Sequence, residues 1–312
     1  MTYLKRFAYF ILTGILVSLT ISVVVSFLSQ FFGIRLGGGG YAGMFALCLL
    51  YGLAGSFISL QLSRWMAKQF HGVEVINPNT MNPTERRLMD TVYRLARTAG
   101  LDTMPEVGYY ESPEVNAFAT GPSKSRSLVA VSTGLLNTMT DSELEGVLAH
   151  EIAHIANGDM VTLTLIQGVV NAFAMFLSWI ITTAIMNAIR GKDDDRRGFG
   201  DWMLRQFVYN MVSIVFMLLG SILVNYFSRQ REFRADAGGA RFASPEKMTA
   251  ALQRLQRITS HPQPQAAEQS GGDGLAAMKI SGKSNGFMTL FMTHPPLEER
   301  ISALQNRTYL QS

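Results

Sequence analysis

Four long stretches of the chain contain no Asp, Glu, Lys or Arg, and they constrain the fold more than any other feature. They are Phe7–Ile34, Leu36–Ser63, Met160–Ile189 and Gln206–Ser228. Each is longer than the roughly 20 residues that an α-helix needs to cross the ~30 Å hydrocarbon core of a bilayer. A spanning helix also satisfies its own backbone polar groups, which a lipid-exposed loop cannot do. The sequence therefore predicts an α-helical membrane protein with four transmembrane helices, arranged as two hairpins.

The composition agrees with this prediction and argues against one class of partner, nucleic acids. Hydrophobic residues make up 48% of the 312 residues and charged residues only 16%, which is low for a soluble domain. The net charge is +4 and no basic cluster is interleaved with aromatic residues, so no nucleic-acid partner is expected. The single cysteine, Cys48, cannot form an internal disulfide, which suits soluble parts that face a reducing compartment. The first apolar run is too long for a signal peptide and is expected to be a retained anchor.

The apolar runs divide the chain into four parts. Residues 1–63 form an N-terminal hairpin, 64–159 a first soluble part, 160–228 a second hairpin and 229–312 a second soluble part. Each soluble part has fewer than about 100 residues, which is small for an independent domain, so the two are expected to fold together. Residues 260–285 are rich in Gly, Ser, Gln and Pro, a composition that predicts a long mobile loop.

The first soluble part carries clear local signals for an α+β domain. Asn82-Pro-Thr-Glu85 predicts a helix start, with Asn as the N-cap, and Gly100 predicts the end of that helix. Pro105–Tyr110 and Ser127–Val131 predict short strands. Thr140-Asp-Ser-Glu143 predicts a capping box at the start of the next helix.

That next helix contains His150-Glu-Ile-Ala-His154. Residues four apart project from one face of a helix, so both imidazoles can reach the same ion. Glu151 lies one step around the helix, where its carboxylate can take a proton from water activated by the metal. Zinc suits this arrangement because it accepts nitrogen and oxygen ligands and leaves one position open. The pattern predicts one Zn²⁺ per chain, with Glu151 as the catalytic base.

A catalytic zinc site of this kind needs a third protein ligand. A helix through Arg231-Glu-Phe-Arg-Ala-Asp236 would place Glu232 and Asp236 on one face. Glu232 could then bind the metal while Asp236 accepts a hydrogen bond from a ligating histidine. The alternative is a cluster of charged residues next to the membrane, and the residues alone leave both interpretations open.

Taken together, these motifs resemble the HtpX family of bacterial membrane zinc metalloproteases, which are relatives of the CAAX-processing endopeptidase of yeast. The matching elements are the two N-terminal runs, Asn116-Ala-Phe-Ala119, His150–Asp159, Glu232-Phe-Arg-Ala-Asp236 and His294-Pro-Pro296. The resemblance implies a gluzincin-type metallopeptidase domain, in which a mixed sheet with a peptide-binding edge strand lies above the zinc helix, and it implies Glu232 as the third ligand. It also implies cleavage of damaged or misfolded membrane proteins in the bacterial inner membrane, as part of stress response and protein quality control.

Two further roles are hypotheses. If Asn116, Ala117, Phe118 and Ala119 are similar to the edge strand of the family, they pair backbone to backbone with an extended substrate; the alternative is an ordinary strand end. His294 is a lone histidine in an ordered motif after the predicted loop, and we hypothesise that it donates a hydrogen bond to the oxyanion of the reaction. The alternative is a turn histidine that precedes two prolines.

The spacing of the ligands also predicts topology. His154 is six residues before Met160, about 9 Å if the segment is helical, and Glu232 follows the fourth run by four residues. Both can bind one ion only if runs three and four form a hairpin whose ends lie on the same side. The metal would then lie at the membrane surface, where water reaches it from one side and segments of membrane-protein substrates reach it from the other.

The distribution of basic residues bears on orientation. Lys5, Arg6, Arg64 and Lys68, against only Arg35 between the first two runs, favour an active site that faces the cytoplasm. Five basic residues in 190–205, on the predicted outer side, argue against this orientation. Either the first helices dominate the orientation, or the second hairpin does not cross the membrane fully.

Two other functions compete with that of a protease. A catalytically silent metal-binding membrane protein would not need Glu151, because ligation requires only the histidines and Glu232. A transporter or channel predicts ionisable residues inside its spans, and the four apolar runs contain no Asp, Glu, Lys or Arg.

Overall fold

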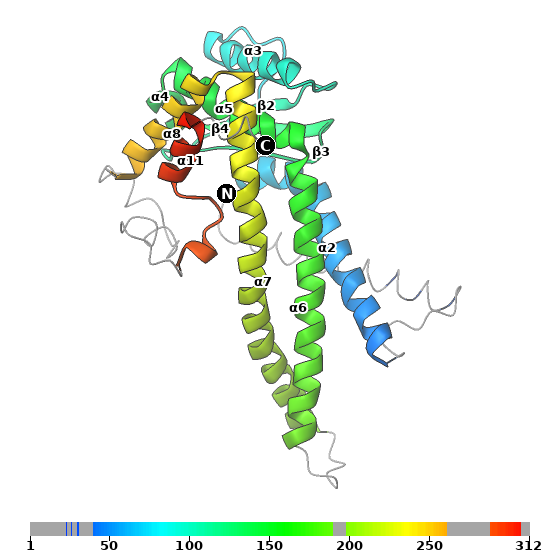
Figure 1. Ribbon diagram of the computed structural model, residues 1–312. Helices are drawn as coiled ribbons and strands as arrows, with labels where there is room; N and C mark the ends of the chain where they lie inside the picture. The colour runs from blue at the N-terminus through cyan, green and yellow to red at the C-terminus, as the bar shows by residue number, and fades with distance from the viewer. Residues whose placement is uncertain are drawn as a thin grey trace. The chain divides into compact units, whose positions relative to one another are not determined.

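The computed structural model describes residues 40–189, 198–260 and 288–306, together with the single positions 23, 26 and 30 (Figure 1). The predicted first transmembrane helix, the charged loop after Ile189 and the predicted mobile loop fall almost entirely outside the described residues. The chain divides into two compact units. A helical unit comprises Met1–Ser59 and Leu163–Val224, and a sheet unit comprises Leu60–Thr162 and Asn225–Ser312.

Three described helices are long and apolar enough to cross a membrane: α2 (Gly40–Phe70), α6 (Asp159–Ile189) and α7 (Phe199–Phe242) (Figure 1). They contain the second, third and fourth apolar runs. Leu165, Val169 and Phe173 lie four residues apart on α6 and are exposed, as expected of a face that contacts lipid rather than protein. The described part of the chain thus accounts for three of the four predicted spans, and the span predicted for Phe7–Ile34 stays a prediction.

Within the helical unit, small residues allow close packing. A Cβ added to Gly52 on α2 would lie 2.3 Å from the carbonyl oxygen of Gly168 on α6, so these two helix backbones approach as only glycine permits. On α7, Arg205 donates a hydrogen bond to Thr183 at 3.2 Å, and a Cβ on Gly220 would lie 2.6 Å from Val170. Because rising numbers on α7 meet falling numbers on α6, these helices pack antiparallel, as the hairpin prediction requires.

The sheet unit contains a mixed sheet of four described strands in the order β1-β2-β4-β3. Their bounds are β1 (Glu74–Val75), β2 (Glu106–Tyr110), β3 (Ala117–Ser123) and β4 (Arg126–Ser132). β2 and β4 are parallel, whereas the other two pairs are antiparallel. β3 is a terminal strand in this order, and it begins at Ala117 within the predicted edge-strand motif.

Short helices complete the sheet unit. They are α3 (Pro83–Thr98), α4 (Thr133–Thr138), α5 (Asp141–Asn157), α8 (Pro245–Ser260), the 3₁₀ helix η1 (Met288–Phe291) and α11 (Leu297–Gln305). The predicted caps are present: Asn82 accepts a hydrogen bond from the Thr84 N–H at 3.0 Å, and Thr140 and Glu143 form a reciprocal capping box. Local sequence therefore fixes where α3 and the metal-site helix α5 begin.

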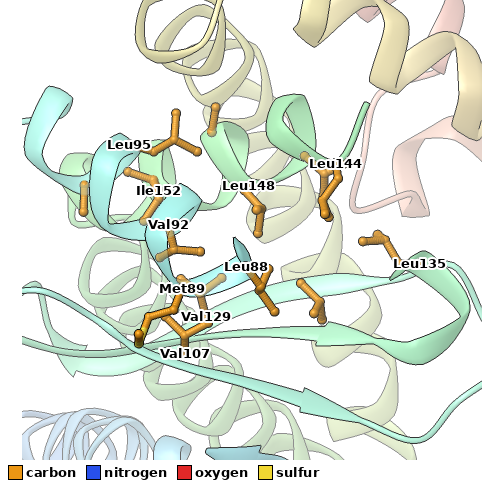
Figure 2. Close-up of a cluster of buried hydrophobic side chains, with 14 of the residues drawn as sticks. Leu88, Met89, Val92, Leu95, Val107, Val129, Leu135, Leu144, Leu148 and Ile152 are labelled. Carbon is orange, nitrogen blue, oxygen red and sulfur yellow. The ribbon is translucent and has the colours of Figure 1, made fainter. Parts of the chain in front are cut away.

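The hydrophobic core holds α5 in place. Figure 2 shows side chains from α3, α4, α5, β2 and β4 directed toward one another. Leu148 and Ile152 of α5 are fully buried in this cluster together with Val92 of α3 and Val129 of β4. Because α5 turns this apolar face to the sheet, His150 lies on a different face of the helix, since it is two positions from both Leu148 and Ile152.

Candidate metal centre

Three side chains of the sheet unit converge on one point. The Nε2 atoms of His150 and His154 lie 3.1 Å apart on α5. Glu232 of α7 places Oε2 at 3.5 Å from Nε2 of His150 and Oε1 at 3.3 Å from Nε2 of His154. One ligand atom from each residue lies within 4.8 Å of the others. Ligands at the usual zinc distance in a tetrahedron are about 3.3 Å apart, so the three residues fit a single zinc ion.

Each histidine has a carboxylate at its other ring nitrogen. Nδ1 of His150 lies 2.9 Å from Asp236, and Nδ1 of His154 lies 2.7 Å from Asp159. A carboxylate that accepts the Nδ1–H proton fixes the tautomer in which Nε2 is free to bind a metal. The sequence predicted this role for Asp236. It did not predict it for Asp159, which lies in the recognised motif and could have been found from its position five residues after His154.

Gly158 separates the metal-site helix from the membrane helix. α5 ends at Asn157, α6 begins at Asp159, and Gly158 between them has a φ of 72°, a left-handed conformation that glycine adopts without strain. The segment from His154 to Met160 is therefore not one continuous helix, and the 9 Å spacing calculated for a helix does not apply. The break places the Asp159 carboxylate beside His154.

The electrostatics of the cluster favour a cation. Burial lowers the pKa of His150, but hydrogen bonds to Asp236 and Glu232 outweigh burial and raise the pKa to about 9. Burial also lowers the pKa of His154, and Asp159, Glu232 and Glu151 together raise it above its ordinary value. Both shifts arise because carboxylates surround the imidazoles, and the same carboxylates stabilise a bound divalent ion.

Arg300 was not predicted as a site residue. Its guanidinium is buried; it donates hydrogen bonds to Asp236 at 2.8 and 2.7 Å and lies 3.3 Å from Oε2 of Glu232. A signal did exist in the sequence, because Arg300 falls on the face of α11 that also carries the buried Ile301 and Leu304. A charged residue on the apolar face of an amphipathic helix implies a buried partner.

Glu151 and His294 flank the ligands. Glu151 follows His150 on α5, is half-buried and lies close enough for its charge to raise the pKa of His154. Nδ1 of His294 lies 2.7 Å from Oε2 of Glu232, and 59% of its side chain is exposed. His294 thus lies on the accessible side of the cluster, where a substrate can reach it.

Contacts outside the cluster hold the segment before His294 and the strand β3. Arg229 donates hydrogen bonds to the carbonyl oxygens of Met292 at 2.9 Å and Leu290 at 3.3 Å, which holds the segment that leads to His294. The predicted substrate-binding residues Ala117, Phe118 and Ala119 lie in β3, against which α5 packs. Asn116 precedes β3, and its carbonyl accepts a hydrogen bond from the Ser132 N–H at 2.9 Å.

A helix that carries His-Glu-x-x-His, joined by a glutamate from a second helix and packed on a mixed sheet, is typical of one class of metallopeptidases. The chain belongs to peptidase family M48, whose profile matches residues 82–308. It is 48% identical to protease HtpX of Shewanella oneidensis and to that of Aeromonas hydrophila, in both cases over 97% of this chain and 100% of the relative. It is 46% identical to the protease HtpX homolog of Bacillus licheniformis, over 96% and 99% of the two chains.

The fold is similar to that in the crystal structure of S. mikatae Ste24p, with a TM-score of 0.59 and 15% sequence identity over 94% of this chain. The matched region is 65% of that longer chain. The family and its relatives confirm the resemblance found in the sequence: this chain is a membrane metalloprotease with a His-His-Glu cluster that can hold a metal ion.

Proposed function

We propose that this metalloprotease uses zinc and cleaves damaged or misfolded membrane proteins in the bacterial inner membrane, with its active site facing the cytoplasm. The observation that carries the zinc assignment is the convergence of two imidazole nitrogens and one carboxylate within 4.8 Å of one another. This donor set, with nitrogen and oxygen atoms at tetrahedral spacing, suits zinc better than calcium or magnesium, which prefer oxygen ligands.

In the proposed mechanism, His150, His154 and Glu232 hold the zinc ion. When bound, zinc supplies the Lewis acidity that allows water to attack a peptide carbonyl at neutral pH. Asp236 and Asp159 keep the imidazoles in the ligating tautomer, because each carboxylate accepts a hydrogen bond from Nδ1–H.

The proton transfers fall to Glu151. As a general base, its carboxylate takes a proton from the attacking water, and as a general acid it passes the proton to the amine that leaves. Glu151 is free for this role because Glu232 supplies the carboxylate of the ligand cluster. His294, on the accessible side of Glu232, is the candidate donor to the oxyanion that forms on the substrate carbonyl.

Substrate selection follows from the surroundings of the site. An extended polypeptide is proposed to pair with β3, the terminal strand in the sheet order, through backbone hydrogen bonds that read little sequence. Such low selectivity suits unfolded chains of many sequences. Three helices able to span a membrane and the HtpX relatives support membrane proteins as the substrate class.

The decisive test uses detergent-purified full-length protein and an unfolded polypeptide substrate. Turnover is expected with stoichiometric zinc, to be lost after removal of the metal with a chelator, and to return when zinc is added back. Zinc bound at one ion per chain without any turnover would instead support a silent metal-binding protein.

Orientation needs a separate test. A cysteine introduced at Gly191, in a chain whose Cys48 is replaced by Ser, is expected to react with a membrane-impermeant thiol reagent applied to intact cells from outside. Protection of this cysteine from the reagent would contradict a second hairpin that crosses fully to the outer side.

A further inference from the structure

The helical unit contains a pocket of about 650 Å³ among α2, α6 and α7. This volume is in the range of pockets that bind small molecules or parts of a polypeptide, roughly 300–1,000 Å³. Gly55 of α2 and Ala174 of α6 are among the lining residues, and a Cβ added to Gly55 would meet nothing within 4 Å, so the space beside it is open. The pocket lies within the three helices that can cross a membrane.

The lining combines an apolar surface with uncharged hydrogen-bonding groups. Most of the surface comes from carbon atoms, including those of Met175 and Met217. The polar members on the three helices are Tyr51, Ser56, Ser59, Thr164, Gln167, Asn171, Tyr209 and Ser213. The described residues of the lining include no Asp, Glu, Lys or Arg. A ligand that fits is therefore uncharged and mostly apolar, with a few hydrogen-bonding groups.

Gln167 and Asn171 are two of these polar lining residues and are joined by a hydrogen bond. They lie one turn apart on α6, both are half-buried, and Nε2 of Gln167 donates a hydrogen bond to Oδ1 of Asn171 at 2.8 Å. One such bond uses one of two N–H donors on Gln167 and one of two lone pairs on Asn171. In a hydrocarbon environment an unpaired polar group is costly, so the donors and lone pairs that this bond leaves over favour a ligand with complementary groups.

We propose that this pocket binds a transmembrane segment of the substrate polypeptide where that segment carries an uncharged polar group, such as an Asn or Gln side chain. This inference rests on the proposed function, because it names what the protease recognises within a membrane protein. Amide groups both donate and accept, as do Gln167 and Asn171, so two amides satisfy each other. A phosphate headgroup would require Lys or Arg, which the described lining lacks.

The consequence is selection of faulty membrane proteins. A correctly assembled span hides its polar side chains against its neighbours, whereas a misassembled span exposes them to lipid. A pocket lined by uncharged polar groups binds the exposed polar side chains of a misassembled span, and so retains it longer than a correctly assembled span. Such retention would raise the chance that the adjoining unfolded chain reaches the metal site.

The test compares two single-span substrates that share the same unfolded, cleavable extension. One span is Leu-rich with a central Asn, and the other has Leu at that position. Wild-type protein in liposomes is expected to cleave the Asn substrate with a kcat/KM about threefold to tenfold higher, the effect expected of one hydrogen bond between membrane helices. The double variant Gln167→Leu/Asn171→Leu is expected to reduce this ratio to near one.

A matched control exists on α7. Gln206 donates a hydrogen bond to Asn210 at 2.9 Å with the same spacing of four residues, and this pair is exposed and not part of the pocket lining. Gln206→Leu/Asn210→Leu is expected to leave the ratio at its wild-type value. A wild-type ratio of one, or an equal fall in both double variants, would overturn the inference.

A second measurement does not depend on turnover. A photoreactive benzophenone amino acid in place of Met175 is expected to cross-link to the Asn span at least threefold more than to the Leu span. The same group at Leu218, which is exposed on α7 and outside the lining, is expected to show no such preference. Absence of preference at Met175 would reject the pocket as a binding site even if both substrates are cleaved, whereas absence of cleavage alone would reject the proposed function.

Discussion

Arg300 holds Asp236 through two hydrogen bonds, from Nε to Oδ2 at 2.8 Å and from Nη2 to Oδ1 at 2.7 Å. Asp236 in turn lies 2.9 Å from Nδ1 of His150, and all three side chains are buried. The series of guanidinium, carboxylate and imidazole thus links α11 and α7 to the metal-site face of α5. The orientation of His150, a candidate metal ligand, therefore depends on a residue 150 positions away in sequence.

Replacement of Arg300 by Met is expected to destabilise the protein by about 3–5 kcal/mol, because it leaves the buried carboxylates of Asp236 and Glu232 without their cation. Arg300→Lys should have a smaller effect, because it keeps the charge but not the two-point geometry. Thermal unfolding in detergent, with chelator present in every sample, measures both. A Met variant as stable as wild type would show that Asp236 does not need this partner.

Asp159→Asn is expected to weaken zinc binding by about 10- to 100-fold, because His154 loses the carboxylate that fixes its tautomer. Competition with a fluorescent zinc chelator gives the affinity. The exposed Asp90 on α3 supplies the control, and Asp90→Asn is expected to bind zinc as wild type does. Equal affinity in the two variants would contradict the role assigned to Asp159.

The sequence predicted those parts of the site that depend on short spacing. The pair His150 and His154, the capping box at Thr140 and the relation of Glu232 to Asp236 are all set within one or two helical turns, where periodicity decides which side chains share a face. The start of α3 was likewise set locally, by Asn82 as its N-cap, and its buried residues Leu88, Val92 and Leu95 recur at helical spacing.

Two of the features that were missed, the position of Arg300 and the pairing of β2 with β4, depend on contacts between distant segments. Arg300 reaches the site only because α11 packs beside α8 and α7, and no local pattern reports that packing. The parallel pairing of β2 with β4 likewise follows from tertiary structure, since a strand of five residues carries no signal for its neighbour. The break at Gly158 is also visible in the sequence as a glycine, but the spacing of about 9 Å from His154 to Met160 assumed a continuous helix.

Glu151→Gln is expected to lower peptidase kcat by about 10²- to 10⁴-fold while zinc remains bound at one ion per chain. The amide is similar in size to the carboxylate but cannot accept a proton. Metal content by mass spectrometry and turnover of an unfolded substrate are both needed. Turnover that survives the change would remove Glu151 from the role of base.

His294→Ala is expected to lower kcat by about 10²- to 10³-fold, the usual cost of losing one oxyanion donor, with a smaller change in KM. Because His294 also contacts Glu232, zinc content must be measured in parallel. A fall in turnover explained entirely by lost zinc would assign His294 to support of the ligand, and unchanged turnover would leave it a turn residue.

Glu145 connects three helices of the sheet unit, since its carboxylate lies 3.1 Å from Arg94 of α3 and 2.8 Å from Lys247 of α8. Burial raises the pKa of Glu145, but the two cations outweigh burial and hold the pKa below 4.5. Glu145→Gln is therefore expected to lower stability by about 1 kcal/mol at neutral pH.

The pH dependence of this contribution has a definite sign. A carboxyl whose pKa is lower in the folded state stabilises the protein above pH 4.5, and the contribution is lost as pH falls through the lowered pKa. The stability difference between wild type and Glu145→Gln should therefore shrink in acid, as measured by thermal unfolding at several pH values. A difference that grows as pH falls would contradict the ion-pair explanation.

The sheet unit is assembled from two pieces of chain, Leu60–Thr162 and Asn225–Ser312. The segment between them, Leu163–Val224, belongs to the helical unit. No single truncation can therefore release a water-soluble catalytic fragment: cutting before the third apolar run discards Glu232, and starting after the fourth discards both histidines. A soluble form for biochemistry would require a splice that joins Thr162 to Asn225 through a designed connector.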